Sequence, residues 1–397
     1  MANTLKFGNG EWYGKEGTIL AYNDENYNYK PLPFNFERDS RATVVNKDGL
    51  IETVGSGQPR IDYKDDSEGA LLLEPQRTNS LPYSADFSTW FATGGASVVG
   101  NKLGVGGSND AFEFLSNGSA NTRLYYSLSN TGELSFSVFA KKNTLDYIAL
   151  YGNGGSNPRV WFNLADGTLG NQEGAGTGSI ESYGNGWYRC TMNWTSASLV
   201  NVRIYNSNEN DVFGGATGSV YIQYAQLEAG SYPTSYIPTQ GSAVTRLADS
   251  CSQTVPDGVI GQTEGVAYAE IDWKGNDEES IFGVLHDGTV NNRMDFGYSA
   301  TFNSFYFNVR TNGSSQGLMQ YSSPIVGKYK IAIAYENNGF ALWVNGVKEA
   351  SDGSGSVPIT TKYNVGNYIG GGREYPIISS KLYDTKLTDA ELQALTS

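Results

Sequence analysis

Short stretches in which apolar and polar residues alternate recur along most of the chain, and they predict β-strands. In residues 160–164 (VWFNL), the period of two places Val160 and Phe162 on one face and Trp161 on the other. Residues 134–139 (LSFSVF) alternate in the same way. The strands are separated by turns rich in Gly, Asn and Ser, at the spacing typical of β-sandwiches. The pattern therefore predicts an all-β protein.

Two hairpins and one helix stand out against this background. Asp48-Gly49 and Asn338-Gly339 lie between alternating segments, where such dipeptides favour tight hairpin turns. The segment KLTDAELQALTS at the end of the sequence predicts a helix. Thr388 would be its N-cap, and Glu391 would complete a capping box.

Residues 223–250 begin as an alternating strand and continue as an arm that contains Pro233 and Pro238. Proline fixes φ and favours extended backbone before it, so this arm is stiffer than a Gly/Ser linker. We expect a strap that lies along a domain surface and holds two sandwiches at a set angle. The alternative is an ordinary solvated linker.

Composition and charge limit the class of partner. The 397 residues include 49 Gly and 27 Tyr, only 17% are charged, and the formal net charge is −14 with a pI near 4.6. Such a balance argues against nucleic acid and against an anionic membrane surface. Neutral glycans are compatible with it, whereas anionic glycans need a bridging cation or a local basic pocket.

The two cysteines and the start of the sequence bear on the compartment. Cys190 and Cys251 are far apart and fit neither a disulfide framework nor a zinc site, so we expect reduced structural thiols. The first residues lack the basic and apolar regions of a secretory signal, and no apolar stretch is long enough for membrane insertion. We therefore expect synthesis in a cytoplasm.

Three stretches together resemble bacteriophage virion proteins of the tail-fibre and head-fibre type. They are residues 34–90 (from FNFERDSRATVV to SADFSTW), residues 184–196 (GNGWYRCTMNWTS) and the strand and arm at 223–250. In that family similar strings surround a jelly-roll module that resembles a carbohydrate-binding module. Residues 256–397 resemble a concanavalin A-like domain of the laminin-G type, through VAYAEIDW, FALWVNGVKE and SSKLYDTKLTDAELQAL.

The resemblance implies a fold class and an order of domains. We expect an all-β chain with a hairpin-rich segment, a jelly-roll sandwich, and a concanavalin A-like sandwich that ends in a short helix. The expected ranges are 1–70 for a virion-docking or oligomerisation segment, 71–230 for the jelly roll, 231–255 for the strap, and 256–397 for the laminin-G-like domain.

The resemblance raises the question of catalysis, because the concanavalin A-like fold also hosts glycosidases. Those of the laminarinase type use a Glu-x-Asp-x-Glu string on one strand. Glu270 and Asp272 match its first two positions, but Lys274 and Gly275 stand where the third carboxylate is needed. The one histidine, His286, lies in a turn without a nucleophile motif. We therefore expect no enzymatic activity.

Acidic turns raise the question of a cofactor. Residues 62–68 and 277–279 carry carboxylates that could hold Ca²⁺, although neither run follows an EF-hand pattern. A solvated charge run is the alternative for each. We expect no required cofactor and leave a structural Ca²⁺ open.

Exposed aromatic and polar residues are the remaining chemistry, since sugar rings pack on aromatic faces and their hydroxyls bond to Asn, Asp and Arg. Core packing or a subunit interface would use the same residue types. The glycan-binding candidates on predicted outward faces are Trp161, Arg203, Tyr205, Trp273, Arg293, Tyr306 and Trp343.

The resemblance and the candidates together predict a non-enzymatic virion surface protein of the tail-fibre or adhesin type. The N-terminal segment would contact other virion proteins of the capsid or tail, the assembly would be a homotrimer, and many copies would bind host or environmental glycans. The alternatives are a capsid decoration or head-fibre protein, a polysaccharide depolymerase, and a structural spacer without a ligand.

Overall fold

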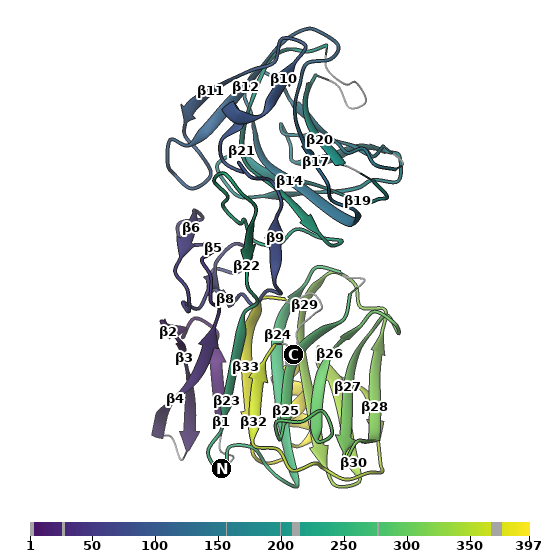
Figure 1. Ribbon diagram of the computed structural model, residues 1–397. Helices are drawn as coiled ribbons and strands as arrows, with labels where there is room; N and C mark the ends of the chain where they lie inside the picture. Colours follow the sequence, from purple (N-terminus) through teal and green to yellow (C-terminus); the bar gives the residue numbers. More distant parts are fainter. Residues whose placement is uncertain are drawn as a thin grey trace. The chain divides into compact units, whose positions relative to one another are not determined.

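The computed structural model describes residues 4–25, 28–155, 157–198, 200–208, 215–275, 278–366 and 375–397. It is nearly all β, with one α-helix, α1 (Asp389–Thr396), and one 3-10 turn, η1 (Phe87–Thr89), among the described residues. The chain forms two units, each built from separate segments (Figure 1). Unit 1 comprises residues 1–41, 54–76 and 247–397, and unit 2 comprises residues 42–53 and 77–246. The expected all-β sandwich fold is confirmed.

Unit 1 contains two sheets. The first, here called the polar sheet, consists in spatial order of β4 (Asn28–Glu37), β23 (Ser250–Thr254), β32 (Lys362–Val365), β25 (Ser280–His286), β26 (Arg293–Ser299), β27 (Ser304–Thr311) and β28 (Ser314–Ser322). The second, the helix sheet, consists of β3 (Thr18–Glu25), β1 (Thr4–Gly8), β33 (Ile377–Tyr383), β24 (Glu264–Trp273), β29 (Gly327–Glu336), β30 (Gly339–Val344) and β31 (Val347–Asp352). The β3–β4 hairpin joins the two sheets.

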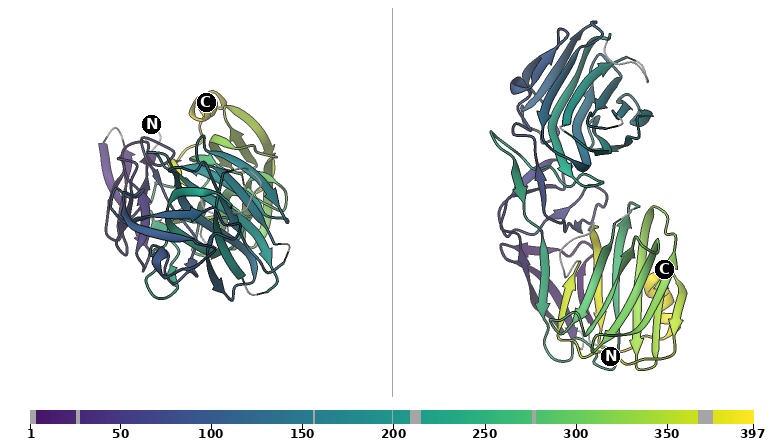
Figure 2. Two further views of the ribbon diagram at one scale, coloured as in Figure 1. Left: turned by 90° about the horizontal axis from the view of Figure 1, so that it is seen from above. Right: turned by 45° about the vertical axis from the view of Figure 1, so that its right-hand side comes forward.

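The core of unit 1 lies between these sheets because alternate residues of each strand are apolar. Phe296 and Phe307 of the polar sheet and Ile271 and Ile333 of the helix sheet are buried in it. Short strands complete the unit: β2 (Tyr13–Lys15), β7 (Ile61–Asp62) and β8 (Ala70–Leu71). Helix α1, yellow in Figure 2, packs through Leu392 on the outer face of the helix sheet. Its capping box between Thr388 and Glu391 is present as predicted.

The N-terminal residues are an integral part of unit 1. Strand β1 pairs with β33 near the end of the chain, with Leu5 opposite Leu382. Leu5, Phe7, Ile19 and Phe34 are buried in the same core as the C-terminal sandwich. The structure thus divides the chain differently from the expected ranges, since residues 1–41 and 54–76 complete the C-terminal sandwich. Alternation alone does not reveal a strand pairing that joins the two ends of a sequence.

A buried ion cluster fastens the separate segments of unit 1. Asp249 accepts hydrogen bonds from Arg38 Nη1 (3.0 Å), from Arg60 Nη2 and from the backbone N–H of Glu74 (2.9 Å). Arg60 also donates to Glu74 Oε2 (2.7 Å). Burial alone would lower the pKa of Arg60, but Asp249 and Glu74 raise it above its ordinary value. Four residues of the stretches 34–90 and 223–250 therefore meet at one point, where they stabilise the fold.

Unit 2 is a sandwich of two six-stranded antiparallel sheets. The platform sheet consists of β10 (Phe91–Thr93), β13 (Arg123–Leu128), β20 (Val200–Ser207), β15 (Tyr147–Tyr151), β16 (Arg159–Asn163) and β17 (Thr168–Glu173). The strap sheet consists of β11 (Ser97–Lys102), β12 (Ala111–Asn117), β21 (Thr217–Ala229), β14 (Gly132–Lys142), β19 (Trp187–Ser196) and β18 (Thr177–Ser182). Their inner faces enclose one core, in which Phe136, Phe162 and Ile204 are fully buried.

The proline-containing arm packs along unit 2. Tyr236 is buried with Phe139 and Trp187 on the outer face of the strap sheet, and it stacks on Tyr224. Glu228 accepts hydrogen bonds from the backbone N–H (2.9 Å) and the hydroxyl (2.5 Å) of Thr234. Residues 231–246 are therefore packed against unit 2 as an ordered part of its fold and are not a solvated linker. That the arm sets an angle between two sandwiches stays a prediction.

Two short strand pairs complete unit 2. Strand β22 (Val244–Arg246) pairs with β9 (Arg77–Asn79), and β5 (Ala42–Val45) pairs with β6 (Ile51–Val54). The turn of the second pair lies at Asp48-Gly49, where Gly49 has a φ of +75°. This hairpin was predicted from the sequence. Thr43 fastens it to the arm by donating to the carbonyl of Tyr236 at 2.6 Å.

Candidate functional site

The outer face of the platform sheet carries an accessible row of aromatic and arginine side chains. Alternation sends Ile148, Leu150 and Ile204 into the core, so their neighbours in sequence point outward. Strand register then aligns one outward residue from each of five successive strands. These residues are Phe91, Tyr125, Arg203, Tyr151 and Arg159.

Cations and rings are in direct contact along this row. The Arg203 guanidinium lies 4.4 Å from the centroid of the Tyr151 ring, and that of Arg159 lies 5.9 Å from the same ring. At the other end, Phe91 stacks on Tyr125 with ring centroids 5.2 Å apart. The Phe91 side chain is 58% exposed. Cation–π contacts of this kind hold guanidinium groups beside the rings.

A second row lies beside the first and supports it. Arg123 is directly opposite Tyr205, which is followed across the sheet by Ala149 and Trp161. The Arg123 guanidinium is 5.8 Å from the Tyr125 ring and 6.0 Å from the Tyr205 ring. The small Ala149 leaves room for the two large side chains on either side of it. Together they form a buried cluster.

Trp161 and Tyr205 lie on the outward face, as predicted, but they are not exposed. Trp161 is 0% exposed and Tyr205 is 6% exposed. Their expected role as open stacking surfaces is therefore wrong for Trp161 and restricted for Tyr205. They form the floor on which Arg123 and Tyr151 rest.

A cleft of about 640 Å³ adjoins the middle of the row at Arg203. Ser127, Asn153, Asn201 and Arg203 contribute its polar lining. Asn201 holds this lining in place: its amide donates to Ser127 Oγ (2.8 Å), and its Oδ1 accepts from Arg203 Nε (2.5 Å). Amide and hydroxyl groups beside an aromatic row are the groups that recognise a polyhydroxylated ligand.

The platform has an excess of positive charge. Arg159 pairs with Glu173 at 3.1 Å. Within the described residues, neither Arg123 nor Arg203 forms an ion pair with a carboxylate. In a chain of net charge −14, this face is therefore a local basic region.

Arg293 and Tyr306 lie on the outer face of the polar sheet of unit 1, where they face a carboxylate. Arg293 Nε is 2.8 Å from Asp295 Oδ1, and Asn308 Nδ2 donates to the same oxygen at 3.0 Å. Burial raises the pKa of Asp295, and Arg293 opposes this shift. Burial, reinforced by the Asp295 charge, raises the pKa of Tyr306. The positive charge of Arg293 is thus compensated within the protein.

The expected outward placement of Trp273 is wrong. Its indole is 1% exposed and packs in the unit 1 core against Tyr298, Phe305 and Tyr375. The reason is parity, because Trp273 shares its face of β24 with the core residues Ala269 and Ile271.

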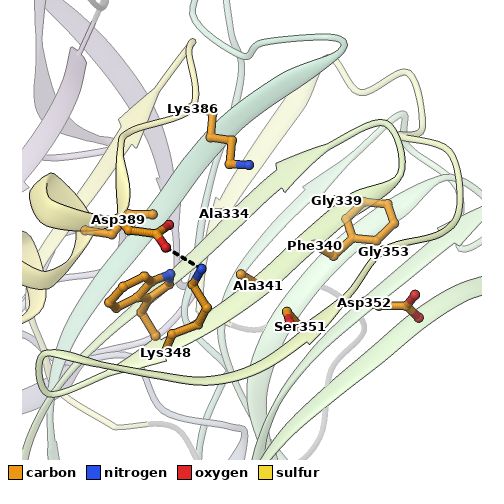
Figure 3. A pocket seen from close by; sticks show the side chains of 12 residues that line it. Ala334, Gly339, Phe340, Ala341, Lys348, Ser351, Asp352, Gly353, Lys386 and Asp389 are labelled. Atoms are coloured by element: carbon orange, nitrogen blue, oxygen red, sulfur yellow. Dashed lines mark hydrogen bonds and ion pairs between the residues drawn. The ribbon is translucent and has the colours of Figure 1, made fainter.

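Trp343 does lie on an outer face, but α1 covers that face. The Trp343 side chain is 5% exposed and packs with Leu392 of the helix. A hollow of about 190 Å³ remains beside it, and Figure 3 shows Lys348 and Asp389 at its edge. Lys348 Nζ lies 5.3 Å from the Trp343 ring and donates to Asp389 at 2.5 Å. The sequence shows the helix but not which face it covers.

The strand with the glycosidase-like string has its two carboxylates on the outer face of the helix sheet. Lys274, in place of the third carboxylate, donates to Asp272 at 2.6 Å. Glu270 accepts from the Tyr268 hydroxyl at 3.2 Å. These contacts give Asp272 and Glu270 the surroundings of a surface charge network.

The sequence left a structural Ca²⁺ open at two acidic turns and predicted reduced thiols. No group of three metal-ligating side chains occurs in the described part of the chain, and Asp277 of the second acidic turn lies outside it. In the first turn, Asp66 pairs with Lys328 at 2.6 Å. Cys190 and Cys251 are buried reduced thiols, as predicted, and burial raises the pKa of Cys190.

Sequence reasoning missed Tyr125, Tyr151, Arg123 and Arg159. The string RLYYSL contains two adjacent tyrosines, so alternation alone did not decide which one faces outward. The available signal was the repeated pairing of arginine and tyrosine at positions two apart, as in Arg123–Tyr125 and Arg203–Tyr205. Residues two apart on a strand share a face.

Comparisons with known proteins concern the fold. No protein-family model matches the chain, and no curated protein sequence matches it significantly. Similar solved structures include a carbohydrate-binding module of a Ruminococcus gnavus sialidase bound to sialyllactose (15% identity, TM-score 0.30), covering 34% of this chain and 84% of that one. Another is domain 4 of a Geobacillus stearothermophilus arabinanase in complex with arabinotriose (10%, TM-score 0.31, 43% and 84%).

Mouse laminin α1 domains LG4-5 are also similar (10% identity, TM-score 0.25, covering 68% of this chain and 88% of that one). None of these three is a bacteriophage protein. At such TM-scores, function has to be argued from the residues of this chain. Among the described residues, no helix has the length and apolar character needed to cross a bilayer.

Proposed function

We propose that the chain is a non-enzymatic glycan-binding protein whose ligand lies on the outer face of the platform sheet. The observation that carries the proposal is the accessible row from Phe91 to Arg159, in which aromatic rings and guanidinium groups alternate across neighbouring strands. Rings supply flat apolar surfaces for sugar C–H groups, and arginines bind the oxygens around them.

The cleft beside the row extends the proposed site. Its amide and hydroxyl groups, held by Asn201, would bind the hydroxyls of a neighbouring sugar. A row and a cleft together suit a chain of several sugars better than a single one. The similar solved structures include proteins bound to sialyllactose and to arabinotriose, which is consistent with this class of ligand.

The decisive experiment is binding of the whole chain to a panel of polysaccharides, with Tyr151→Ala and Tyr125→Ala as test variants. Each should lower the affinity for the bound glycan about tenfold or more, because central aromatic anchors carry most of an interface's binding energy. Tyr13→Ala is the matched control, since Tyr13 is a 54% exposed tyrosine in unit 1. Unchanged affinity in both test variants would place the ligand elsewhere on the protein, and no binding of the unaltered chain to any member of the panel would contradict the proposal.

We also propose that the protein acts on the exterior of a bacteriophage particle, as a homotrimer of the tail-fibre or adhesin type. The resemblance of residues 34–90, 184–196 and 223–250 supports this setting. Mass spectrometry of purified particles tests it, and particle maps separate a tail position from a capsid or head-fibre position. Sedimentation analysis of the purified protein tests the trimer.

A further inference from the structure

We propose that the platform selects anionic saccharides, meaning glycans that carry carboxylate or sulfate groups, and that Arg123 and Arg203 are the residues that select them. This inference rests on the proposed glycan-binding function and names the chemical class of its ligand.

The outer face of the platform carries a local positive charge. Three arginines and one glutamate lie in the two outward rows of the platform. The whole chain carries −14, so its overall field repels an anion and the platform must attract one locally. Arginine can also donate to neutral sugar hydroxyls, so the argument for an anion depends on the net positive charge of this face.

The guanidinium groups on this face are held by contacts with tyrosine rings. Arg203 and Arg159 both contact the Tyr151 ring, and Arg123 lies between the Tyr125 and Tyr205 rings. These contacts hold the guanidinium groups in place before any ligand arrives, which reduces the side-chain entropy lost on binding. A fixed guanidinium fork matches the two oxygens of a carboxylate or sulfate.

Arg123 and Arg203 differ from several other arginines of the chain in their partners. Arg38, Arg60 and Arg293 each contact at least one carboxylate. For Arg203, the polar partners are Asn201 Oδ1 and the Tyr205 hydroxyl, and both are neutral. Arg123 has ring contacts and, in the part of the chain that the structure describes, no carboxylate partner. An acidic sugar would provide the missing counter-charge.

The test uses two matched pairs of polymers with the whole chain. The first is a polyuronic acid and its carboxyl-reduced neutral form, and the second is a sulfated galactan and its desulfated form. We expect at least one anionic polymer to bind about tenfold or more tightly than its neutral partner, because hydrogen bonds to charged groups exceed neutral ones by about that factor. Binding should weaken with added salt. The pair that shows the difference identifies the anionic group.

Variants assign the effect to residues. Arg203→Gln and Arg123→Gln should remove most of the preference and of the salt dependence, and Arg203→Lys should restore part of it. Lys142→Gln, which removes a positive charge from the strap sheet, is the control and should change neither. Melting temperatures of all variants confirm that they fold.

The outcomes separate this inference from the proposed function. Equal binding of neutral and anionic partners, or full preference in both arginine variants, overturns the selection of anions. If polymers bind without a preference for anions and Tyr151→Ala abolishes their binding, the proposed glycan-binding function holds and only the selection of anions is wrong. If no polymer binds, or if Tyr151→Ala and Tyr125→Ala change nothing, both proposals fall.

Discussion

Two arginines of the unit 2 platform differ from three arginines of unit 1 in the groups that surround them. In unit 1, Arg38 and Arg60 are fully buried and share Asp249, and Arg293 pairs with Asp295. In unit 2, Arg123 and Arg203 rest on tyrosine rings of an accessible face. The difference shows that residue type alone does not mark a binding site. In unit 1 the carboxylates compensate the arginine charge, whereas Arg123 and Arg203 have only neutral partners in the described part of the chain, which is why we propose them as ligand-binding residues.

The strongest challenge to this comparison is the removal of Asp249. Asp249→Ala leaves two buried guanidinium groups without their shared anion, so we expect unit 1 to lose about 3–5 kcal/mol of unfolding free energy. Urea unfolding of the whole chain measures the loss. Asp146→Ala is the control, because its partner Lys142 is about half exposed. A loss of unfolding free energy similar to that of the control would show that the ion cluster does not stabilise unit 1.

A smaller effect is expected at the polar sheet. Asp295→Ala removes the acceptor of Asn308 and the counter-ion of Arg293, both near the surface, so we expect a loss of about 1–3 kcal/mol. Thermal unfolding measures it. The same variant should leave glycan binding unchanged. Weaker binding would move the candidate site to unit 1.

A pH dependence sharpens the contrast further, since unit 1 holds the one histidine of the chain. Burial lowers the pKa of His286 below its ordinary value of 6.5, helped by Lys362 and opposed by the hydrogen bond with Asn364. The unfolded chain then takes up a proton before the folded chain does, so stability falls as the pH drops below about 6.5.

Melting temperatures between pH 7.5 and 5.5 measure this effect, which should be weaker than either aspartate substitution. His286→Gln should flatten the profile over that range. An unchanged slope in the variant would assign the dependence to carboxylates.

The smallest expected effect concerns the platform itself. Arg123→Gln and Arg203→Gln should change the unfolding free energy by no more than about 1 kcal/mol, because neither breaks an ion pair within the described residues and only neutral hydrogen bonds and ring contacts are lost. Urea unfolding checks this. A loss above about 2 kcal/mol would show that these arginines are structural, as in unit 1.

The sequence predicted local features better than distant ones. Alternation placed Val160 and Phe162 in the core and Trp161 opposite them, and the capping box of α1 was found directly. Trp273 was misplaced although its parity with Ile271 was visible. The burial of Trp343 under α1 could not be predicted, because alternation gives the faces of a strand and not what covers them.

The candidate site was predicted only in part for the same reason. Arg203 and Tyr205 were predicted as candidates. The rows of outward residues to which they belong depend on the registers between strands that are far apart in sequence. The Asp249 cluster is a stronger example, since its arginines lie about 190 to 210 residues away. Only folding brings such groups together.

The pairing of β1 with β33 has a consequence for biosynthesis. The first strand leaves the ribosome long before its partner is translated, and until then Leu5 and Phe7 lack the sheet that buries them. Unit 2 can fold once residue 246 has been translated, whereas unit 1 also needs the residues after 247. Unit 1 therefore begins first in the sequence but is completed last. A chain that terminates early leaves its own beginning unpaired, which makes truncated products targets for proteolysis and favours the accumulation of full-length protein.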